Sequence, residues 1–96
     1  MANISFKWDK DKNSLNKTKQ GISFEEAQTV FVDETALLLH DQDHSHEEDR
    51  FILLGLSSSL RILVVCHCYR KNDDVIRIIS VRKATRSEQK QYWERW

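Results

Sequence analysis

Three β-prone runs lie close together in the second half of the chain, and they limit the fold more than any other feature. The runs cover residues 51–56, 62–69 and 75–81, and each is rich in Val, Ile, Leu or aromatic residues. Polar segments at residues 57–59 and 71–74 separate them, and segments of this composition form turns. Because short turns join strands as antiparallel hairpins, we expect three consecutive strands of one sheet.

Two helices are expected before these runs. Asp9 can cap a helix that extends to about Lys19, and Gly21 can end it in a conformation with positive φ. Ser23 and Glu26 have the spacing of a capping box, in which each side chain satisfies the other residue's backbone N–H. Apolar residues at helical spacing follow, so the second helix is expected to pack on the sheet.

The remaining elements complete an α+β domain. Residues 3–8 alternate between apolar and polar, as in a half-buried strand, and residues 36–40 form another short apolar run. Thr85 and Glu88 have the spacing of a second capping box, which opens a C-terminal helix. The expected order is β-α-α-β-β-β-β-α in a single domain over residues 1–96: an antiparallel β-sheet with two N-terminal helices and a C-terminal helix.

Composition sets limits on the class of protein. Apolar residues make up 40% and charged residues 31% of the chain, which is ordinary for a globular domain. No run of about 18 apolar residues suggests a membrane span, and no N-terminal apolar region suggests a secretory signal. Cys66 and Cys68 lie two apart in a predicted strand, so they are expected on one face as free thiols in a reducing, cytoplasmic compartment.

Charge is distributed unevenly although the net charge is zero. Residues 33–49 contain seven Asp or Glu and no Lys or Arg. Residues 61–96 contain nine Lys or Arg against four Asp or Glu, a net charge of +5. The basic end favours a phosphate-bearing partner such as nucleic acid, whereas the acidic segment is suited to repel phosphate or to face a basic partner.

The residues at these elements carry a family resemblance over nearly the whole chain. In the first half the resemblance is carried by Phe6-Lys7-Trp8-Asp9, Asn13, Lys19, Gly21-Ile22-Ser23-Phe24-Glu25-Glu26-Ala27, Val30-Phe31 and Asp33. In the second half it is carried by His46, Glu48, Arg50, Gly55-Leu56-Ser57, Arg61-Ile62-Leu63-Val64-Val65, Arg70, Ile76-Arg77-Ile78-Ile79-Ser80, Arg82-Lys83-Ala84-Thr85, Glu88 and Tyr92. Together these residues resemble those of the BrnT toxins. The chain departs from that family at Gln20, where a histidine is frequent, and at Val81, where alanine is usual.

The resemblance implies a RelE-like fold and a ribonuclease toxin of a bacterial type II toxin–antitoxin pair. The implied partners are an RNA substrate and a BrnA-type antitoxin, which would connect the toxin to operator DNA only indirectly. No cofactor, metal or membrane is implied. An alternative is a non-catalytic subunit that binds the antitoxin within a DNA-bound autorepressor complex.

Metal-independent cleavage of RNA requires groups that stabilise charge on the phosphate and groups that move protons. Arg77 and Arg82 are the candidates for charge stabilisation, and His67 and Tyr92 are the candidates for proton transfer. Further RNA contacts are expected from the cationic side chains of Arg61, Lys83 and Arg86.

Strand alternation leaves open whether the two catalytic arginines share a site. In a regular strand Arg77 and Arg82 point to opposite faces, and a bulge near Ser80 would redirect one of them. The alternative role for Arg77 is a salt bridge to Glu48 or Asp49. Arg50 and Arg61 are equally suited to flank strands on the surface.

Other readings apply to the proton-transfer candidates and to the acidic segment. His67 could be a hydrogen-bonded core residue, and Tyr92, Trp93 and Trp96 could form the packing stripe of the last helix. A metal site in the histidine-containing residues 40–47 is not expected, because the spacing matches no known ligand motif. We expect an acidic loop there.

Overall fold

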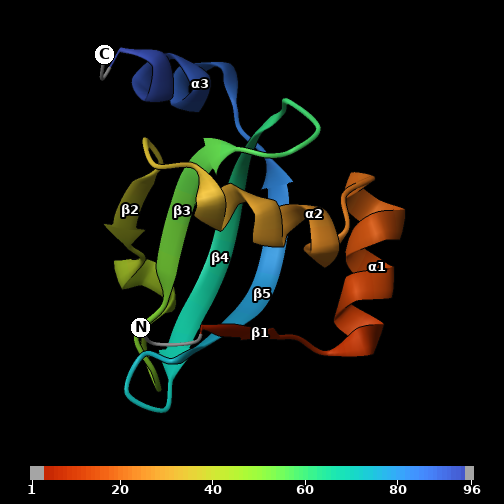
Figure 1. The fold of residues 1–96 in the computed structure, drawn as a ribbon, viewed down its shortest axis with the longest axis vertical. Coiled ribbons are helices and arrows are strands. Elements are labelled where there is room, and N and C mark those ends of the chain that lie inside the picture. The colour runs from red at the N-terminus through yellow and green to blue at the C-terminus, as the bar shows by residue number, and fades with distance from the viewer. Residues whose placement is uncertain (1–3, 95–96) are drawn as a thin grey trace.

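The computed structural model describes residues 4–94, which form a five-stranded sheet with helices on both faces (Figure 1). The strand order is β1-β5-β4-β3-β2. Strands β2 (Leu37–His40), β3 (Phe51–Leu56), β4 (Ile62–Arg70) and β5 (Val75–Lys83) form an antiparallel meander, as predicted for its last three members. Strand β1 (Ser5–Lys7) pairs in parallel with β5, so the sheet is mixed rather than purely antiparallel.

The predicted order of elements is confirmed. Helix α1 spans Lys10–Gln20, helix α2 spans Phe24–Thr29 and helix α3 spans Arg86–Trp93. A short 3-10 helix, η1 (Val30–Val32), continues α2, and a second, η2 (Gln42–His44), lies in the acidic loop. None of the helices among the described residues has the length and apolar character needed to cross a membrane.

Helix α1 lies at the β5 side of the sheet and begins and ends as predicted. Asp9 accepts hydrogen bonds from the N–H groups of Asp11 and Lys12, and Gly21 ends the helix at φ 68°. The side chain of Asn16 bonds both the N–H and the C=O of Val81, at 3.1 and 3.0 Å. Asn16 therefore satisfies the outer edge of β5 beyond the point where β1 stops pairing.

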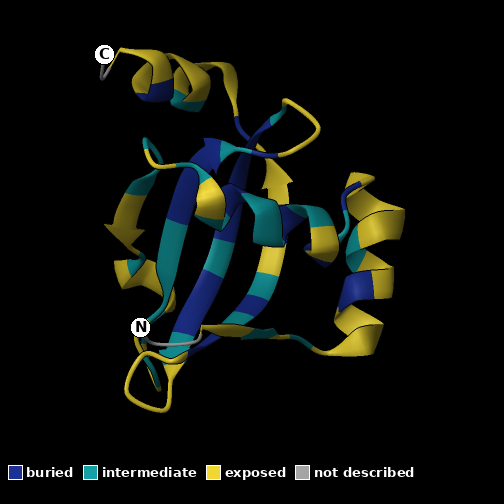
Figure 2. Ribbon diagram, in the orientation of Figure 1, coloured by how far each residue is buried: buried dark blue, intermediate teal, exposed yellow. Residues whose placement is uncertain are grey.

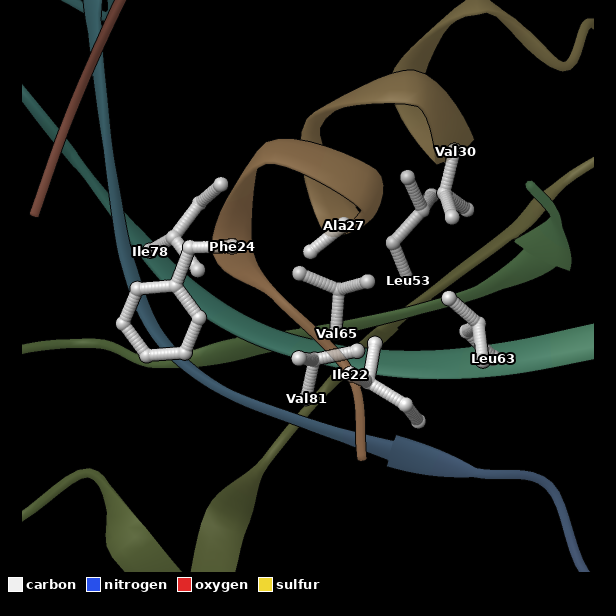
Figure 3. Packing of buried hydrophobic residues seen from close by; sticks show 9 residues of the cluster. All are labelled: Ile22, Phe24, Ala27, Val30, Leu53, Leu63, Val65, Ile78 and Val81. Carbon is white, nitrogen blue, oxygen red and sulfur yellow. The ribbon is translucent and has the colours of Figure 1, made fainter. Parts of the chain in front are cut away.

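Helix α2 covers one face of the sheet and forms the main core with it. Phe24, Ala27 and Val30 are fully buried there against Val65 and Val81, among others (Figure 3). The complete set in this cluster is Ile22, Phe24, Ala27, Val30, Leu53, Leu63, Val65, Ile78 and Val81.

The capping box predicted for α2 forms only in part. Ser23 Oγ accepts from the N–H of Glu26 at 3.0 Å, but the Glu26 carboxylate bonds Arg61 and Ser57 instead of the Ser23 backbone. The box predicted for α3 is complete, because Thr85 and Glu88 satisfy each other's backbone N–H groups.

Helix α3 covers one end of the opposite face. There Tyr92 packs with Leu54, Ile62, Val64 and Ala84 in a second, smaller core. Figure 2 shows the largely buried middle strands behind α2, with exposed residues along β2 and over much of α1 and α3. Tyr92 thus lies on the packing side of the last helix, as the alternative of a packing stripe predicted. Trp93 is half-exposed, and Trp96 lies outside the described residues.

A β-bulge in β5 decides which side chains share a face. Cys66 on β4 pairs with Ser80, and the next residue, His67, pairs with Ile78, so Ile79 is the extra residue. Since residues paired across antiparallel strands point to the same side, the bulge reverses the alternation of β5 at this point. Arg77 and Arg82 consequently lie on one face, as the bulge alternative predicted.

Candidate functional site

A groove runs along the sheet face opposite α2, beside the part that α3 covers. It has a volume of about 450 Å³ and lies between α1, the acidic loop and strands β3 to β5. We call it the sheet groove; its polar lining comprises Asn16, Gln20, Asp41, Asp43, His44, Arg50, Ser80 and Arg82, with Cys66 at its base. Burial raises the pKa of the Cys66 thiol, so Cys66 is a neutral thiol in this lining.

Arg82 is the predicted catalytic residue that lines the groove directly, and its guanidinium already has a partner. Its two terminal nitrogens bond the two carboxylate oxygens of Glu88 at 2.7 and 2.9 Å. This bidentate pair, together with the Thr85 N–H, lowers the pKa of Glu88 to about 2. An anion in the groove must therefore compete with Glu88 for Arg82.

Arg77 lies on the same face as Arg82 but not in the lining of the groove. Their partners on β4, Cys68 and Val64, are four residues apart, which corresponds to roughly 13 Å along the strand. Among residues 4–94 Arg77 forms no ion pair. Its predicted alternative partners are engaged elsewhere, because Glu48 pairs with Arg70 at 3.0 Å and Asp49 with His40 at 3.2 Å.

His67 lies on the other side of the sheet, away from both arginines. It is fully buried, and its ring nitrogens bond Val65 O at 3.0 Å and Tyr69 Oη at 3.2 Å. The Phe31 ring packs edge-on against it, with centroids 4.8 Å apart. Desolvation lowers the pKa of His67, so the imidazole is neutral, which matches the predicted alternative of a hydrogen-bonded core residue.

Tyr92 is also buried, and its hydroxyl is engaged in the packing of α3. The hydroxyl donates to Asp33 Oδ2 at 2.6 Å and lies 2.9 Å from Thr35 Oγ1. Although burial raises the pKa of Asp33, hydrogen bonds from the Leu56 N–H, Tyr92 and Thr35 lower it overall, so the carboxylate is charged. Tyr92 thereby anchors α3 to the segment that enters β2.

The three predicted RNA-binding residues lie at different places. Arg61 forms an ion pair with Glu26 through its Nε, at 3.0 Å, and through a terminal nitrogen. The Arg61 guanidinium is the main reason that the pKa of Glu26 is lowered. Lys83 pairs with Leu63 and so faces the α2 side, whereas the exposed Arg86 begins α3.

His44 and Arg50 line the groove and offer suitable chemistry, but they were not among the predicted site residues. His44 is exposed, and its Nδ1 lies 3.0 Å from Asp41 Oδ2 and 3.1 Å from Asp41 Oδ1. Arg50, which precedes β3, contributes a guanidinium that forms no ion pair within the described part of the chain. In the sequence Arg50 was among the residues that carry the family resemblance, whereas His44 was only one of several histidines within an acidic segment.

Asp41, His44, Glu48 and Asp49 of the acidic loop form pairs, either with one another or with neighbouring strands. Within residues 4–94 no group of three or more His, Cys, Asp or Glu is close enough to hold a metal ion. His40 and His44 each contact an aspartate instead, Asp49 and Asp41 respectively. Cys66 and Cys68 are free thiols, as predicted.

A mixed sheet with one helix across one face and a C-terminal helix on the other is the fold of a known ribonuclease toxin. The crystal structure of the Brucella abortus ribonuclease toxin BrnT matches with a TM-score of 0.66 and 21% identity, covering 88% of this chain and 100% of that one. At this identity the match establishes the fold. A comparison with curated protein sequences gives no match.

The family follows from the sequence itself. Residues 8–88 match the profile of the ribonuclease toxin BrnT of type II toxin–antitoxin systems. The chain therefore belongs to the BrnT family. The matched residues extend from the end of β1 to the first turn of α3, so they include every element that lines the sheet groove.

Proposed function

We propose that this chain is an endoribonuclease toxin that cleaves RNA in the sheet groove without a metal ion and so inhibits growth. The bulge at Ile79 is the observation that carries the proposal, because it directs Arg77, Ser80 and Arg82 to one open face. A strand without the bulge would direct Arg82 toward the side of α2. Membership of the BrnT family supports ribonuclease activity in particular.

The cationic side chains on this face act as phosphate ligands in the proposal. Arg50 and Arg82 reach the groove, and Arg77 lies about one nucleotide or two further along the same face. An RNA backbone laid along β5 would meet Arg77 and Arg82 in succession, with Arg50 two strands away at the start of β3. Their charge would stabilise the additional negative charge that develops on the phosphate during cleavage.

His44 is the proton-transfer group of the proposal. With Nδ1–H donating to Asp41, Nε2 has a free lone pair, and an imidazole in this tautomer can act as a general base. His44 Nε2 would take the proton of the 2′-hydroxyl, the 2′-oxygen would bond to phosphorus, and the bond from phosphorus to the 5′-oxygen would break. Water would protonate that oxygen, and the hydroxide so formed would take the proton back from His44, leaving a 2′,3′-cyclic phosphate.

The experiment is cleavage of a defined RNA by the purified chain in excess EDTA, followed by mapping of the product ends. We expect cyclic-phosphate ends, and we expect His44→Ala to slow cleavage by about 100-fold. His46→Ala is the matched control, because His46 lies in the same loop and outside the lining of the groove. Intact RNA after incubation with the wild-type chain would overturn the proposal.

The antitoxin would be of the BrnA type. It would bind operator DNA directly, and the toxin would be connected to the DNA only through the antitoxin. Induction of the toxin gene in the cytoplasm of a bacterium, with and without a neighbouring antitoxin gene, tests this part. We expect growth arrest that co-expression of the antitoxin relieves.

A second candidate function is a non-catalytic subunit that binds the antitoxin within an autorepressor complex. One observation favours it: Arg61 and Arg82 are both engaged by carboxylates of the chain itself, Glu26 and Glu88. Co-purification with the antitoxin together with intact RNA and unimpaired growth would support this function over the first.

A further inference from the structure

The sheet face that carries α2 is not covered completely. Next to β2 the structure has a second hollow, of about 530 Å³, at the end of the sheet that α2 does not reach. Leu38, Phe51 and Tyr69 form its base, and Glu48, Asp49 and Asp73 form its rim. We call it the acidic hollow. Figure 1 shows α2 crossing in front of β3 to β5, with β2 beside it, and Figure 2 shows exposed residues along β2.

The base of the acidic hollow is apolar and aromatic. Leu38 is 50% exposed although it is a leucine in a strand, and Phe51 and Tyr69 are half-buried. The two rings pack edge to face, with centroids 5.3 Å apart and planes at 67°. Aromatic faces attract cations, and an exposed leucine beside them gains from contact with an aliphatic stem.

The rim is negative. Asp73 forms no ion pair within residues 4–94, whereas Glu48 and Asp49 contact Arg70 and His40 in pairs that are open to solvent. Solvent-exposed pairs of this kind contribute little, so an incoming cation can replace Arg70 or His40. Asp73 and Tyr69 line the same hollow, and the charge of Asp73 adds to burial in raising the pKa of the Tyr69 hydroxyl.

This chemistry selects one kind of occupant. The lining of the acidic hollow has three carboxylates and no Lys or Arg, so it repels a phosphate backbone, whereas in the sheet groove Arg50 and Arg82 balance Asp41 and Asp43. We propose that the acidic hollow is the docking surface for a basic, partly apolar segment of a partner polypeptide, with an arginine seated between the aromatic base and the carboxylate rim. The proposal holds whether or not the chain cleaves RNA.

The adjacent strand favours an extended partner segment. Strand β2 is the last strand on its side of the sheet, so every second residue directs its backbone N–H and C=O outward. Leu38 belongs to both β2 and the acidic hollow. A partner strand added along β2 would direct alternate side chains onto the same face as Leu38, Phe51 and Tyr69.

The proposal can be tested with a synthetic peptide of the sequence Gly-Arg-Leu-Arg-Leu-Arg-Gly, blocked at both ends. A second peptide carries citrulline at each arginine, which keeps the shape and removes the charge. Binding to the ¹⁵N-labelled full chain is followed by amide chemical shifts. We expect shifts centred on residues 37–40, 51 and 69–73, and an affinity at least about fivefold weaker for the citrulline peptide.

Variants of the chain distinguish binding at the acidic hollow from non-specific attraction of the peptide to acidic residues elsewhere. Asp73→Asn is expected to weaken binding of the arginine peptide about threefold, and it suits the positive φ of 70° at this position, which asparagine tolerates. Tyr69→Leu removes the ring and is expected to weaken binding by a similar factor, with folding checked by circular dichroism. Asp11→Asn is the matched control, since Asp11 lies on α1 at the other side of the sheet.

Several results would overturn the proposal. They are the absence of shifts at millimolar peptide, equal affinity for both peptides, shifts confined to the sheet groove, and equal losses in Asp11→Asn and Asp73→Asn. A concentration-dependent dimer whose interface shifts coincide with residues 37–40 would also overturn it, because the occupant would then be a second copy of the chain.

Discussion

The two faces of the sheet differ in how completely a helix covers them, and this difference separates stability from chemistry. On the α2 face Phe24 and its neighbours form a closed core, and a histidine on that face, His67, is neutral and buried. On the other face α3 covers one end only, and Arg82 lies beside an open groove. Charged side chains are accessible to a ligand only over the parts of the sheet on which no helix packs.

The largest effect is expected from a cavity on the α2 face. Phe24→Ala removes a fully buried ring and should lower the free energy of unfolding by about 3–5 kcal/mol. Chemical denaturation measures the loss. Leu15→Ala, on the exposed side of α1, is the control and should change stability by less than about 0.5 kcal/mol. Equal effects of the two substitutions would show that α2 does not form the core described here.

On the groove face the large effect should be on activity. Arg82→Ala should slow RNA cleavage by about 100-fold or more, near 3 kcal/mol, because the lost guanidinium would stabilise the transition state. Arg82→Lys keeps the charge but loses the bidentate geometry, so it should retain an intermediate rate. Single-turnover cleavage measures both, and thermal unfolding shows whether the fold persists. Unchanged cleavage in folded Arg82→Ala would remove Arg82 from the site.

Sequence alone predicted the elements well because their signals are local. Asp9, Gly21 and Thr85 act on backbone groups within a few residues, and each was found in its expected role. Glu26 was predicted to close the α2 capping box, but its carboxylate bonds Arg61, 35 residues away. A local motif does not report such a competitor, because the competitor arrives through tertiary packing.

The candidate site was harder to predict because one inserted residue changes every direction after it. Ile78 and Ile79 are both apolar, so the sequence offers no sign of which one is the extra residue of the bulge. The alternation of side chains along β4 correctly predicted that His67 and Cys66 point to opposite faces of the sheet. It did not predict which of these faces α2 would cover. His44 reaches the groove from a loop, where no periodic pattern exists to predict direction.

Tyr92→Phe tests whether a predicted catalytic residue on the groove face acts through packing alone. The substitution keeps the ring and removes the hydroxyl that donates to Asp33, so unfolding should become easier by about 1–2 kcal/mol. Cleavage of RNA should stay within a factor of about two, measured at a temperature where the variant is folded. A loss of about 100-fold with little change in stability would instead identify Tyr92 as a proton donor.

His67 gives the α2 face a pH dependence of known sign. Since burial lowers its pKa below 6.5, the unfolded chain binds more protons than the folded chain as the pH falls below that value. The contribution of His67 to the free energy of unfolding should therefore be constant above about pH 7. Below pH 6.5 it should fall, by at most about 1.4 kcal/mol per pH unit. Denaturation at several pH values measures the slope.

Two variants assign that slope to the buried histidine. His67→Gln should remove it, whereas His46→Gln should leave it unchanged, because His46 is exposed. A slope that persists in His67→Gln would have to come from other groups, and the closed core under α2 would then contribute no pH dependence of its own.

The smallest effect on stability should come from substitution of Glu88. This residue bonds Arg82 in the groove and also caps helix α3, so it contributes both to the candidate site and to stability. Its pKa of about 2 is below the ordinary 4.5, so its stabilisation is complete above pH 4.5 and is lost as the pH falls toward 2. Glu88→Gln should lower stability at neutral pH by about 1 kcal/mol and reduce the further loss of stability at acid pH.

Glu88→Gln also removes the carboxylate that engages Arg82. Binding of a non-cleavable RNA should therefore strengthen severalfold and become more dependent on salt, since a freed guanidinium displaces an additional counterion. Glu94→Gln is the control, because its pair with Lys90 is exposed and lies outside the groove. Weaker RNA binding in Glu88→Gln would mean that Glu88 orients Arg82 toward the phosphate rather than competing with it.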